Sequence, residues 1–305
     1  MFRVLAGQMS VMLLLIAIGM YARKREIVTE EGKKTLSDLV IKIILPCNIV
    51  HAYLIDLPGN FFVAFLEVLM LTILNQTVAM VVTHFFYNRI PKKEKNIYQY
   101  ATVCSNAGFM GNAVAEAVFG ETGLLYASIF LIPQRIMMWT AGISFFEKKT
   151  DRKGMYKKVL LHPCMIATYF GLFAMIFHVK LPESLNNTIT SVSNCCNAIT
   201  MMYIGMVLVG VDWKNLVSKA QLYFCLIRLI GMPLVIFCVC RCFKLDSFVM
   251  GVSVLLAGMP AGSTTTILAT QYGADEETAA KCVVLSTALS VITTFVWEMI
   301  LLSYL

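Results

Sequence analysis

Apolar segments long enough to cross a bilayer follow one another along almost the whole chain. Their approximate bounds are 3–22, 36–55, 61–87, 97–119, 122–145, 159–178, 188–210, 220–240, 246–271 and 279–303. Because about 20 apolar residues in a helix span the hydrocarbon core, each segment predicts a transmembrane helix. The polar stretches between segments are short, so the pattern predicts an all-α polytopic membrane protein with ten spans and no soluble domain.

Two of these segments, the fourth and the ninth, are interrupted by residues that weaken helices. The fourth contains Ser105-Asn-Ala-Gly-Phe-Met-Gly-Asn112, and the ninth contains Met259-Pro-Ala-Gly-Ser-Thr-Thr265. Glycine and proline cost about 1 and 3 kcal/mol in a helix interior, and unpaired backbone groups are costly in hydrocarbon. Such breaks persist at membrane depth where they line an enclosed or wet cavity, so the pair indicates the binding site of a transporter.

The charges between the segments predict the orientation of the chain. Loops 23–35, 88–96, 146–158, 211–219 and 272–281 hold 18 of the 25 lysine and arginine residues. By the positive-inside rule these loops are cytoplasmic, and both termini lie outside the cell membrane. The net charge of +7 thus comes mainly from basic residues that set the membrane topology. It gives no reason to expect a nucleic-acid partner.

Ten spans divide into two sets of five, and an odd number of spans forces the two halves into opposite orientations. The sequence therefore predicts an inverted repeat. Its units are 1–145 (helices 1–5) and 159–305 (helices 6–10), joined by a cytoplasmic linker at 146–158. A weak internal similarity at an offset of 152 residues, which pairs Gly19 with Gly171, agrees with this division.

Composition narrows the function classes. The chain is 58% hydrophobic and 14% charged, with a mean hydropathy of +0.74, whereas soluble domains carry about 25% charged residues. The ten cysteines and four histidines are scattered, so neither a metal site nor a cofactor is expected. An intramembrane enzyme needs a nucleophile with its base, or paired aspartates at depth, and the spans offer neither.

Motifs along most of the chain resemble the auxin efflux carrier family, which includes plant PIN proteins and many bacterial carriers. The matching stretches are Leu45-Pro46, Asn106-Ala-Gly-Phe-Met-Gly111, Gln134-Arg-Ile-Met-Met-Trp139, Phe145-Phe-Glu147, Met259-Pro-Ala-Gly262, Tyr272-Gly273, Leu285-Ser-Thr287 and Leu289-Ser290. The chain is similar to the short members, which lack the long cytosolic insertion of the plant carriers. It departs from the family where a proline commonly follows each crossing point, because Ala113 and Thr265 stand there.

The resemblance implies an elevator-type secondary transporter in the plasma membrane. Helices 1, 2, 6 and 7 would form a scaffold and the homodimer interface, and helices 3–5 and 8–10 would form a moving transport domain with broken crossover helices 4 and 9. The family carries organic anions, from the auxin indole-acetate in plants to malate-like or malonate-like acids in bacterial relatives. The coupling ion, H⁺ or Na⁺, stays open, and an anion channel or uniporter with the same broken-helix site is the alternative.

The chemistry of the two breaks also favours an anion. A broken helix presents free N–H groups and the positive end of its dipole, and two breaks in opposite register can aim both ends at one point. Neutral donors add hydrogen bonds without the cost of burying a lysine. The candidate substrate-binding residues are Asn48, Asn106, Gly108, Gly111, Asn112, Gln134, Arg135, Pro260, Gly262, Ser263, Thr264 and Thr265.

Several of these residues have a second, structural interpretation. Asn106 is the first choice for a carboxylate contact, but it could instead cap a broken helix, as could Ser263 to Thr266. Arg135, in the middle of the fifth segment, would either contact substrate or tie helices by donating to the carbonyls of a neighbouring break. Pro46 is expected to break the second helix.

Overall fold

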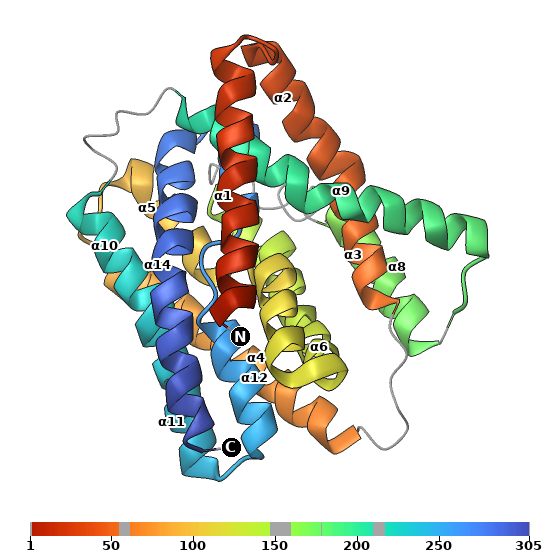
Figure 1. Ribbon diagram of the computed structural model, residues 1–305, viewed down its shortest axis with the longest axis vertical. Coiled ribbons are helices and arrows are strands. Elements are labelled where there is room, and N and C mark those ends of the chain that lie inside the picture. Colours follow the sequence, from red (N-terminus) through yellow and green to blue (C-terminus); the bar gives the residue numbers. More distant parts are fainter. Residues whose placement is uncertain (1, 55–61, 147–159, 178, 210–216, 305) are drawn as a thin grey trace.

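The regular structure of this chain is helical throughout the residues described. The computed structural model covers residues 2–54, 62–146, 160–177, 179–209 and 217–304 (Figure 1). Six helices in this part are long and apolar enough to cross a membrane: Glu30–Tyr53, Val63–Phe86, Thr122–Gly142, Glu183–Leu208, Lys219–Phe243 and Glu276–Leu301. The all-α, multi-span prediction is confirmed to this extent, and the count of ten spans stays a prediction.

The described residues up to 146 form nine helical elements. They are α1 (Phe2–Lys24), α2 (Glu30–Leu39), η1 (Val40–Ile44), α3 (Leu45–Tyr53), α4 (Phe62–Phe86), α5 (Lys92–Val103), η2 (Ala107–Gly111), α6 (Asn112–Met137) and η3 (Met138–Gly142). Thr29 begins α2 by accepting a hydrogen bond from Gly32 N at 3.1 Å. Gly120, at φ 68° and ψ −160°, bends α6 at the boundary expected between the fourth and fifth segments.

The break predicted at Pro46 is wrong. The segments α2, η1 and α3 run as one continuous helix from Glu30 to Tyr53. Pro46 lies in the first turn of α3, directly after the wider π-helical turn η1. Within this helix the wider turn before Pro46 absorbs the irregularity that its missing N–H group causes, so the proline does not end the span.

Within 160–177, 179–209 and 217–304, eight more elements are described. They are α8 (Pro163–Ile176), α9 (Glu183–Leu208), α10 (Lys219–Leu226), η5 (Ile227–Gly231), α11 (Met232–Phe243), α12 (Ser247–Ala257), α13 (Thr264–Gln271) and α14 (Glu276–Leu302). Polar side chains fix several helix starts: Asp246 accepts from Phe248 N, and Asp275 accepts from Thr278 N. The segment predicted as the ninth span is thus two helices, α12 and α13, with an irregular stretch between them.

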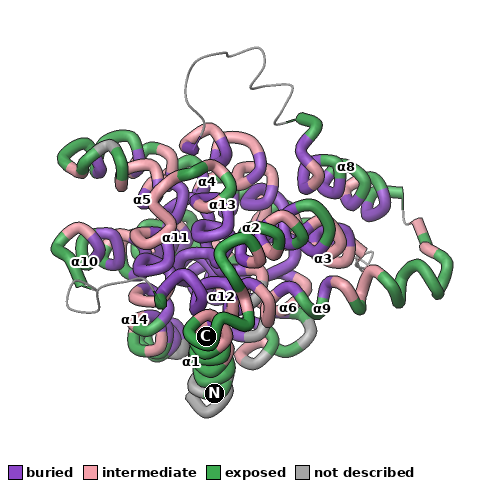
Figure 2. Tube along the Cα trace, turned by 90° about the horizontal axis from the view of Figure 1, so that it is seen from above, coloured by how far each residue is buried: buried purple, intermediate pink, exposed green. Residues whose placement is uncertain are grey.

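The helices pack in two groups. In one group α3 packs against α8 and α9, and α9 crosses α1; in the other α4, α5, α6, α10, α11, α12, α13 and α14 pack together. Contacts of α14 with α1 and α9, and of α13 with α2, join the groups. Burial is greatest along α12 and α13 (Figure 2), whereas large apolar side chains on α4 and α8, such as Met70 and Phe173, are exposed, as on a surface that meets lipid.

Candidate functional site

The two interrupted stretches cross each other at the centre of the second group. Ser105 and Ala261 form an isolated antiparallel bridge. Asn106 N donates to Pro260 O at 2.8 Å, and Gly262 N donates to Cys104 O at 2.9 Å. Each interruption therefore satisfies backbone groups that the other leaves without a helical partner, which removes much of the cost of breaking two helices at this depth.

Gly262 is required by this close approach of two backbones. A Cβ atom there would lie 3.1 Å from Cys104 O and 3.3 Å from Ser105 O. Gly111, next to the crossing, faces α12: a Cβ atom on it would lie 2.6 Å from Leu256 Cδ2. Both glycines thus serve the packing of the crossing directly.

Arg228, on η5, holds the buried side of the crossing. Its Nε donates to Met259 O and its Nη1 to Thr102 O, both at 2.9 Å, and the residue is only 1% exposed. These carbonyls lie at or just beyond the C-terminal ends of α12 and α5, where the helix dipoles are negative. One guanidinium therefore ties the ends of both interrupted helices. Sequence analysis considers such a tie for Arg135, and in the structure Arg228 makes it.

Gln134 braces the first interruption from α6. Its Nε2 donates to Ser105 O at 2.9 Å, and its Oε1 accepts from Ser105 Oγ at 3.0 Å. Both ends of this buried amide are used within the protein. On the other interruption, Tyr100 OH donates to Thr264 Oγ1 at 3.3 Å, and Ser286 Oγ accepts from Ala261 N at 3.1 Å.

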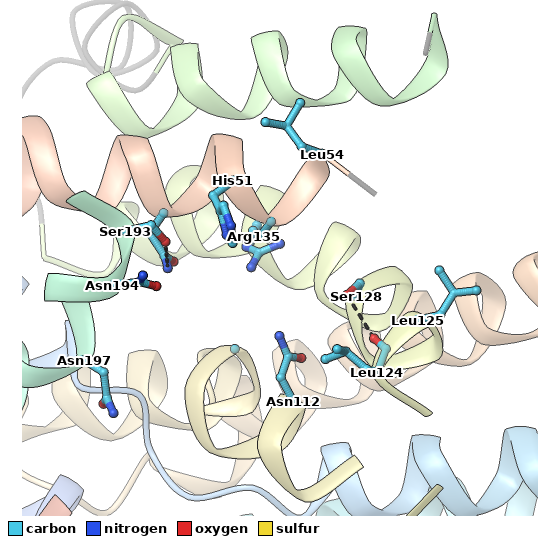
Figure 3. A pocket seen from close by; sticks show the side chains of 13 residues that line it. His51, Leu54, Asn112, Leu124, Leu125, Ser128, Arg135, Ser193, Asn194 and Asn197 are labelled. Carbon is cyan, nitrogen blue, oxygen red and sulfur yellow. Dashed lines mark hydrogen bonds between the residues drawn. The ribbon is translucent and has the colours of Figure 1, made fainter. Parts of the chain in front are cut away.

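Two cavities meet on the opposite side of the crossing. The larger, of about 540 Å³, lies between α3, α6 and α9 (Figure 3). The smaller, of about 50 Å³, reaches both interruptions. They share Asn48, Gly108 and Arg135 as lining residues, so together they form one polar recess, called here the crossing cavity. Among the described residues, no carboxylate lines either part.

Arg135 is the charged residue of the crossing cavity. It is 6% exposed and its guanidinium lies over the Tyr53 ring, 5.4 Å from the centroid. Its Nη1 has no hydrogen-bond partner within the described chain. A buried positive charge is costly unless an opposite charge or hydrogen bonds offset it, and the described lining of this cavity offers Arg135 no carboxylate.

Asparagines supply the remaining polar groups of the cavity. Asn106 Nδ2 and Asn112 Oδ1 are buried without hydrogen-bond partners in the described part of the chain. Asn106 precedes η2 and Ser263 precedes α13, yet neither side chain makes a capping hydrogen bond. The capping alternative considered for these two side chains is therefore not what the structure shows.

The predicted site residues divide into three sets. The larger part of the cavity is lined by Asn48, Gly108, Asn112 and Arg135, and the smaller part adds Asn106, Gln134, Gly262, Ser263 and Thr264. Gly111, Pro260 and Thr265 line neither part. The larger part is also lined by His51, Ser193, Asn194 and Asn197. Sequence reasoning gives no role to His51 and Ser193, and for Asn194 and Asn197 it favours hydrogen bonding between helices over substrate contact. The spacing of these residues could have indicated the cavity, because 48 and 51, like 194 and 197, are three residues apart and lie on one face of their helix.

A polytopic helical chain whose interrupted helices meet beside a polar cavity has the features of a membrane transport protein. Comparison with known proteins supplies the family. The model of the family described as membrane transport protein matches residues 5–155 and 152–298. The chain belongs to this family, that of the auxin efflux carriers.

Its relatives carry transporter names. An uncharacterized transporter of Methanocaldococcus jannaschii is 23% identical over 96% of this chain and 97% of its own length. The uncharacterized transporter YfdV of Escherichia coli is 21% identical over 95% and 96%. A protein of Rhizobium meliloti, provisionally named a malonate transporter, is 24% identical over 68% of each chain.

Proposed function

We propose that this protein is a secondary carrier for a small organic anion with at least one carboxylate. The observation that carries the proposal is Arg135: it lines a cavity that has no carboxylate among the described residues, and its buried Nη1 has no hydrogen-bond partner there. Asn48, Asn106 and Asn112 add amide groups to the same cavity. The name of the Rhizobium meliloti relative supports small dicarboxylates such as malonate as the first compounds to test.

Helix ends at the crossing favour the same charge. The helical path restarts at Ala107 in the first interruption and at Thr264 in the second. Free N–H groups and positive dipole ends at two adjacent helix starts stabilise an anion between them. In the proposed ten-helix, five-plus-five inverted repeat, these starts belong to equivalent broken helices of oppositely oriented halves.

The proposed transport step is a displacement of one packing group against the other, as in an elevator. The group of α1, α3, α8 and α9, with α2, would be the scaffold and the homodimer interface, and the other group would carry the substrate. Polar contacts join them at the end of the molecule next to the 23–35 loop: Lys33 Nζ lies 2.7 Å from Glu276 Oε1, and Tyr203 OH donates to Thr270 Oγ1 at 2.6 Å. These contacts would close the cytoplasmic end.

The crossing cavity opens at the other end. Leu54 directly follows α3, and Leu124 and Leu125 follow the bend at Gly120; all three leucines line the cavity. The helix from Glu30 to Tyr53 leads from the basic 23–35 loop to this mouth. With that loop in the cytoplasm and both termini outside, the conformation would be outward-facing and ready to load its anion.

Uptake and counterflow in proteoliposomes test the proposal. The purified protein should accumulate labelled malonate in a saturable manner, and unlabelled dicarboxylate on the far side should accelerate exchange, whereas choline should not compete. Protein-free liposomes provide the background. Flux that does not saturate, with discrete current steps in planar bilayers, would indicate the channel alternative. Absence of uptake and of carboxylate binding would contradict the proposed function.

A reversible cross-link tests the elevator step on the same protein. Ser37 Oγ and Ile267 O lie 3.5 Å apart, on α2 of one group and α13 of the other. In a variant without native cysteines, a disulfide between Ser37→Cys and Ile267→Cys should stop transport, and reduction should restore it. Unchanged turnover of the fully oxidised protein would show that the two groups need not move past each other.

A further inference from the structure

His51 places a second group able to carry positive charge in the crossing cavity. It lies on α3, is half-buried, and lines the larger part of the cavity. Figure 3 shows its imidazole beside the Arg135 guanidinium, with the two side chains entering from α3 and α6. The imidazole makes no hydrogen bond within the described part of the chain, so no structural role is evident for it there.

The other groups around His51 are neutral. The remaining polar lining residues from α3, α6 and α9 are amides and hydroxyls: Asn48, Asn112, Ser128, Ser193, Asn194 and Asn197. The elements packed against α3 are α8, α9 and η1, and they contribute no charged side chain to the lining that is described. Arg135 is therefore the one charged partner of His51 among these residues, and its charge has the same sign as a protonated imidazole.

Two adjacent positive charges repel each other unless an anion lies between them. A dicarboxylate carries two negative charges, which match Arg135 together with a protonated His51. We infer that the crossing cavity binds a small dicarboxylate together with one proton, and that His51 holds this proton. This inference rests on the proposed function and specifies the ligand of the same site. By reciprocity, the dianion strengthens protonation of His51 by the factor by which the proton strengthens anion binding.

The position of His51 also decides what the proton does. It lies on α3, in the group proposed as the static scaffold, whereas Arg135 lies on α6, in the group proposed to move. When the anion leaves with the moving group, the proton on His51 loses its counter-charge and returns to the outer solution. The proton therefore promotes anion binding from the outer solution and is not transported with the anion.

Calorimetry on the purified full-length protein tests the inference. Oxalate and fumarate are suitable probes because both carboxylates of each stay ionised between about pH 6 and about pH 8. Titrations in buffers of different ionisation enthalpy should show uptake of about one proton per anion near pH 8. The affinity near pH 6 should exceed that near pH 8 by roughly ten- to thirtyfold, as expected for titration of one histidine.

A matched pair of variants assigns the proton. In His51→Gln, oxalate should bind without proton uptake, with an affinity that does not vary between about pH 6 and about pH 8 and that is weaker than the affinity of the parent near pH 8. His84→Gln, at an exposed histidine on α4 that lines neither part of the cavity, should keep the full pH dependence of the parent.

The outcomes separate the two proposals. Dicarboxylate binding by the parent without proton uptake, or proton uptake that persists in His51→Gln, overturns the inference and leaves the carrier function standing. If no carboxylate binds at any pH, the proposed function itself is wrong. Should His51→Gln fail to fold, the calorimetry of the parent still decides whether a proton is taken up.

Discussion

The crossing has a packed side, which Arg228 holds, and a cavity side, where Arg135 lines the crossing cavity. Each side thus carries a buried arginine, and the two arginines make different contacts. On the packed side, Arg228 donates through Nε and Nη1 to carbonyls of both interrupted stretches. On the cavity side, Arg135 leaves Nη1 unused and rests its guanidinium on the Tyr53 ring. Burial is similar, at 1% and 6% exposure, and each guanidinium has one buried nitrogen without a partner in the described chain, Nη2 in Arg228 and Nη1 in Arg135. The difference lies in the bonds that are made: Arg228 makes two to backbone carbonyls, and the hydrogen bonds of the described residues include none from Arg135 to a carbonyl.

The same contrast extends to the neutral polar groups. Gln134 uses both ends of its amide on Ser105, whereas the Nδ2 of Asn106, one residue further on, has no partner within the described chain. A polar group without a partner costs free energy in the folded protein unless a ligand or water satisfies it. Of these two amides, both in the lining of the smaller part of the cavity, the protein itself satisfies Gln134, and Asn106 keeps a donor that a bound anion would satisfy.

The largest expected effect is the loss of the Arg228 clamp. Arg228→Leu leaves the carbonyls of Thr102 and Met259 buried without donors, so the free energy of unfolding should fall by roughly 2–6 kcal/mol. Denaturant or thermal unfolding in detergent measures it. Arg241→Leu, at an exposed arginine on α11, is the control and should change stability little. Wild-type stability of Arg228→Leu would show that the clamp does not hold the crossing.

Arg135→Gln should have the opposite effect: a large loss of dicarboxylate affinity with a small change in stability. Removing a charge that pairs with a carboxylate costs about 2–5 kcal/mol of binding, so dicarboxylate affinity should fall at least about thirtyfold. Stability should change by less than about 2 kcal/mol, because no hydrogen bond to its Nη1 is lost and the guanidinium gives up only its contact with the Tyr53 ring. Lys42→Gln, at an exposed lysine 3.0 Å from Asp38, is the control. Unchanged affinity with a large loss of stability would make Arg135 a helix tie after all.

The sequence predicts the helical class and the place of both interruptions for a physical reason. Glycine and proline at membrane depth act locally, through the backbone of their own segment. The clustered residues of Ser105–Asn112 and Met259–Thr265 therefore indicate where helices weaken. Pro46 shows the limit of this argument, because a wider turn upstream absorbs its missing N–H group.

The division of roles between the two arginines could not be predicted in the same way. Both lie in apolar segments, and helical spacing fixes only the face of the helix on which each projects. What packs opposite that face depends on tertiary structure. For the same reason the sequence does not bring His51 and Asn197 together, although they line one cavity from α3 and α9.

Asn106→Ala should have a smaller effect than either arginine variant. If Nδ2 donates to the substrate carboxylate, its loss should weaken binding by about 1–3 kcal/mol, the range for a hydrogen bond to a charged group. Because this Nδ2 has no protein partner in the described chain, stability without ligand should hardly change. Asn75→Ala, at a buried asparagine on α4 outside the cavity, should leave affinity unchanged. Equal losses in both variants would remove Asn106 from the site.

The smallest expected effect is at Thr264, which lies between the two sides. Its Oγ1 accepts from Tyr100 OH at 3.3 Å, although the residue also lines the smaller part of the cavity. Thr264→Val should therefore cost about 0.5–1.5 kcal/mol of stability, the net value of one hydrogen bond. Affinity for a dicarboxylate should change by less than about threefold, or 0.7 kcal/mol.

Tyr100→Phe provides the matched partner for a double-mutant cycle. If the two hydroxyls serve each other, the stability losses of the single variants should not add in the double variant. Binding titrations on all four proteins should then give nearly the same dissociation constant. A loss of affinity in Thr264→Val as large as in Asn106→Ala, with additive stabilities, would assign this hydroxyl to the ligand. Thr264 would then belong to the cavity side and not to the packed side.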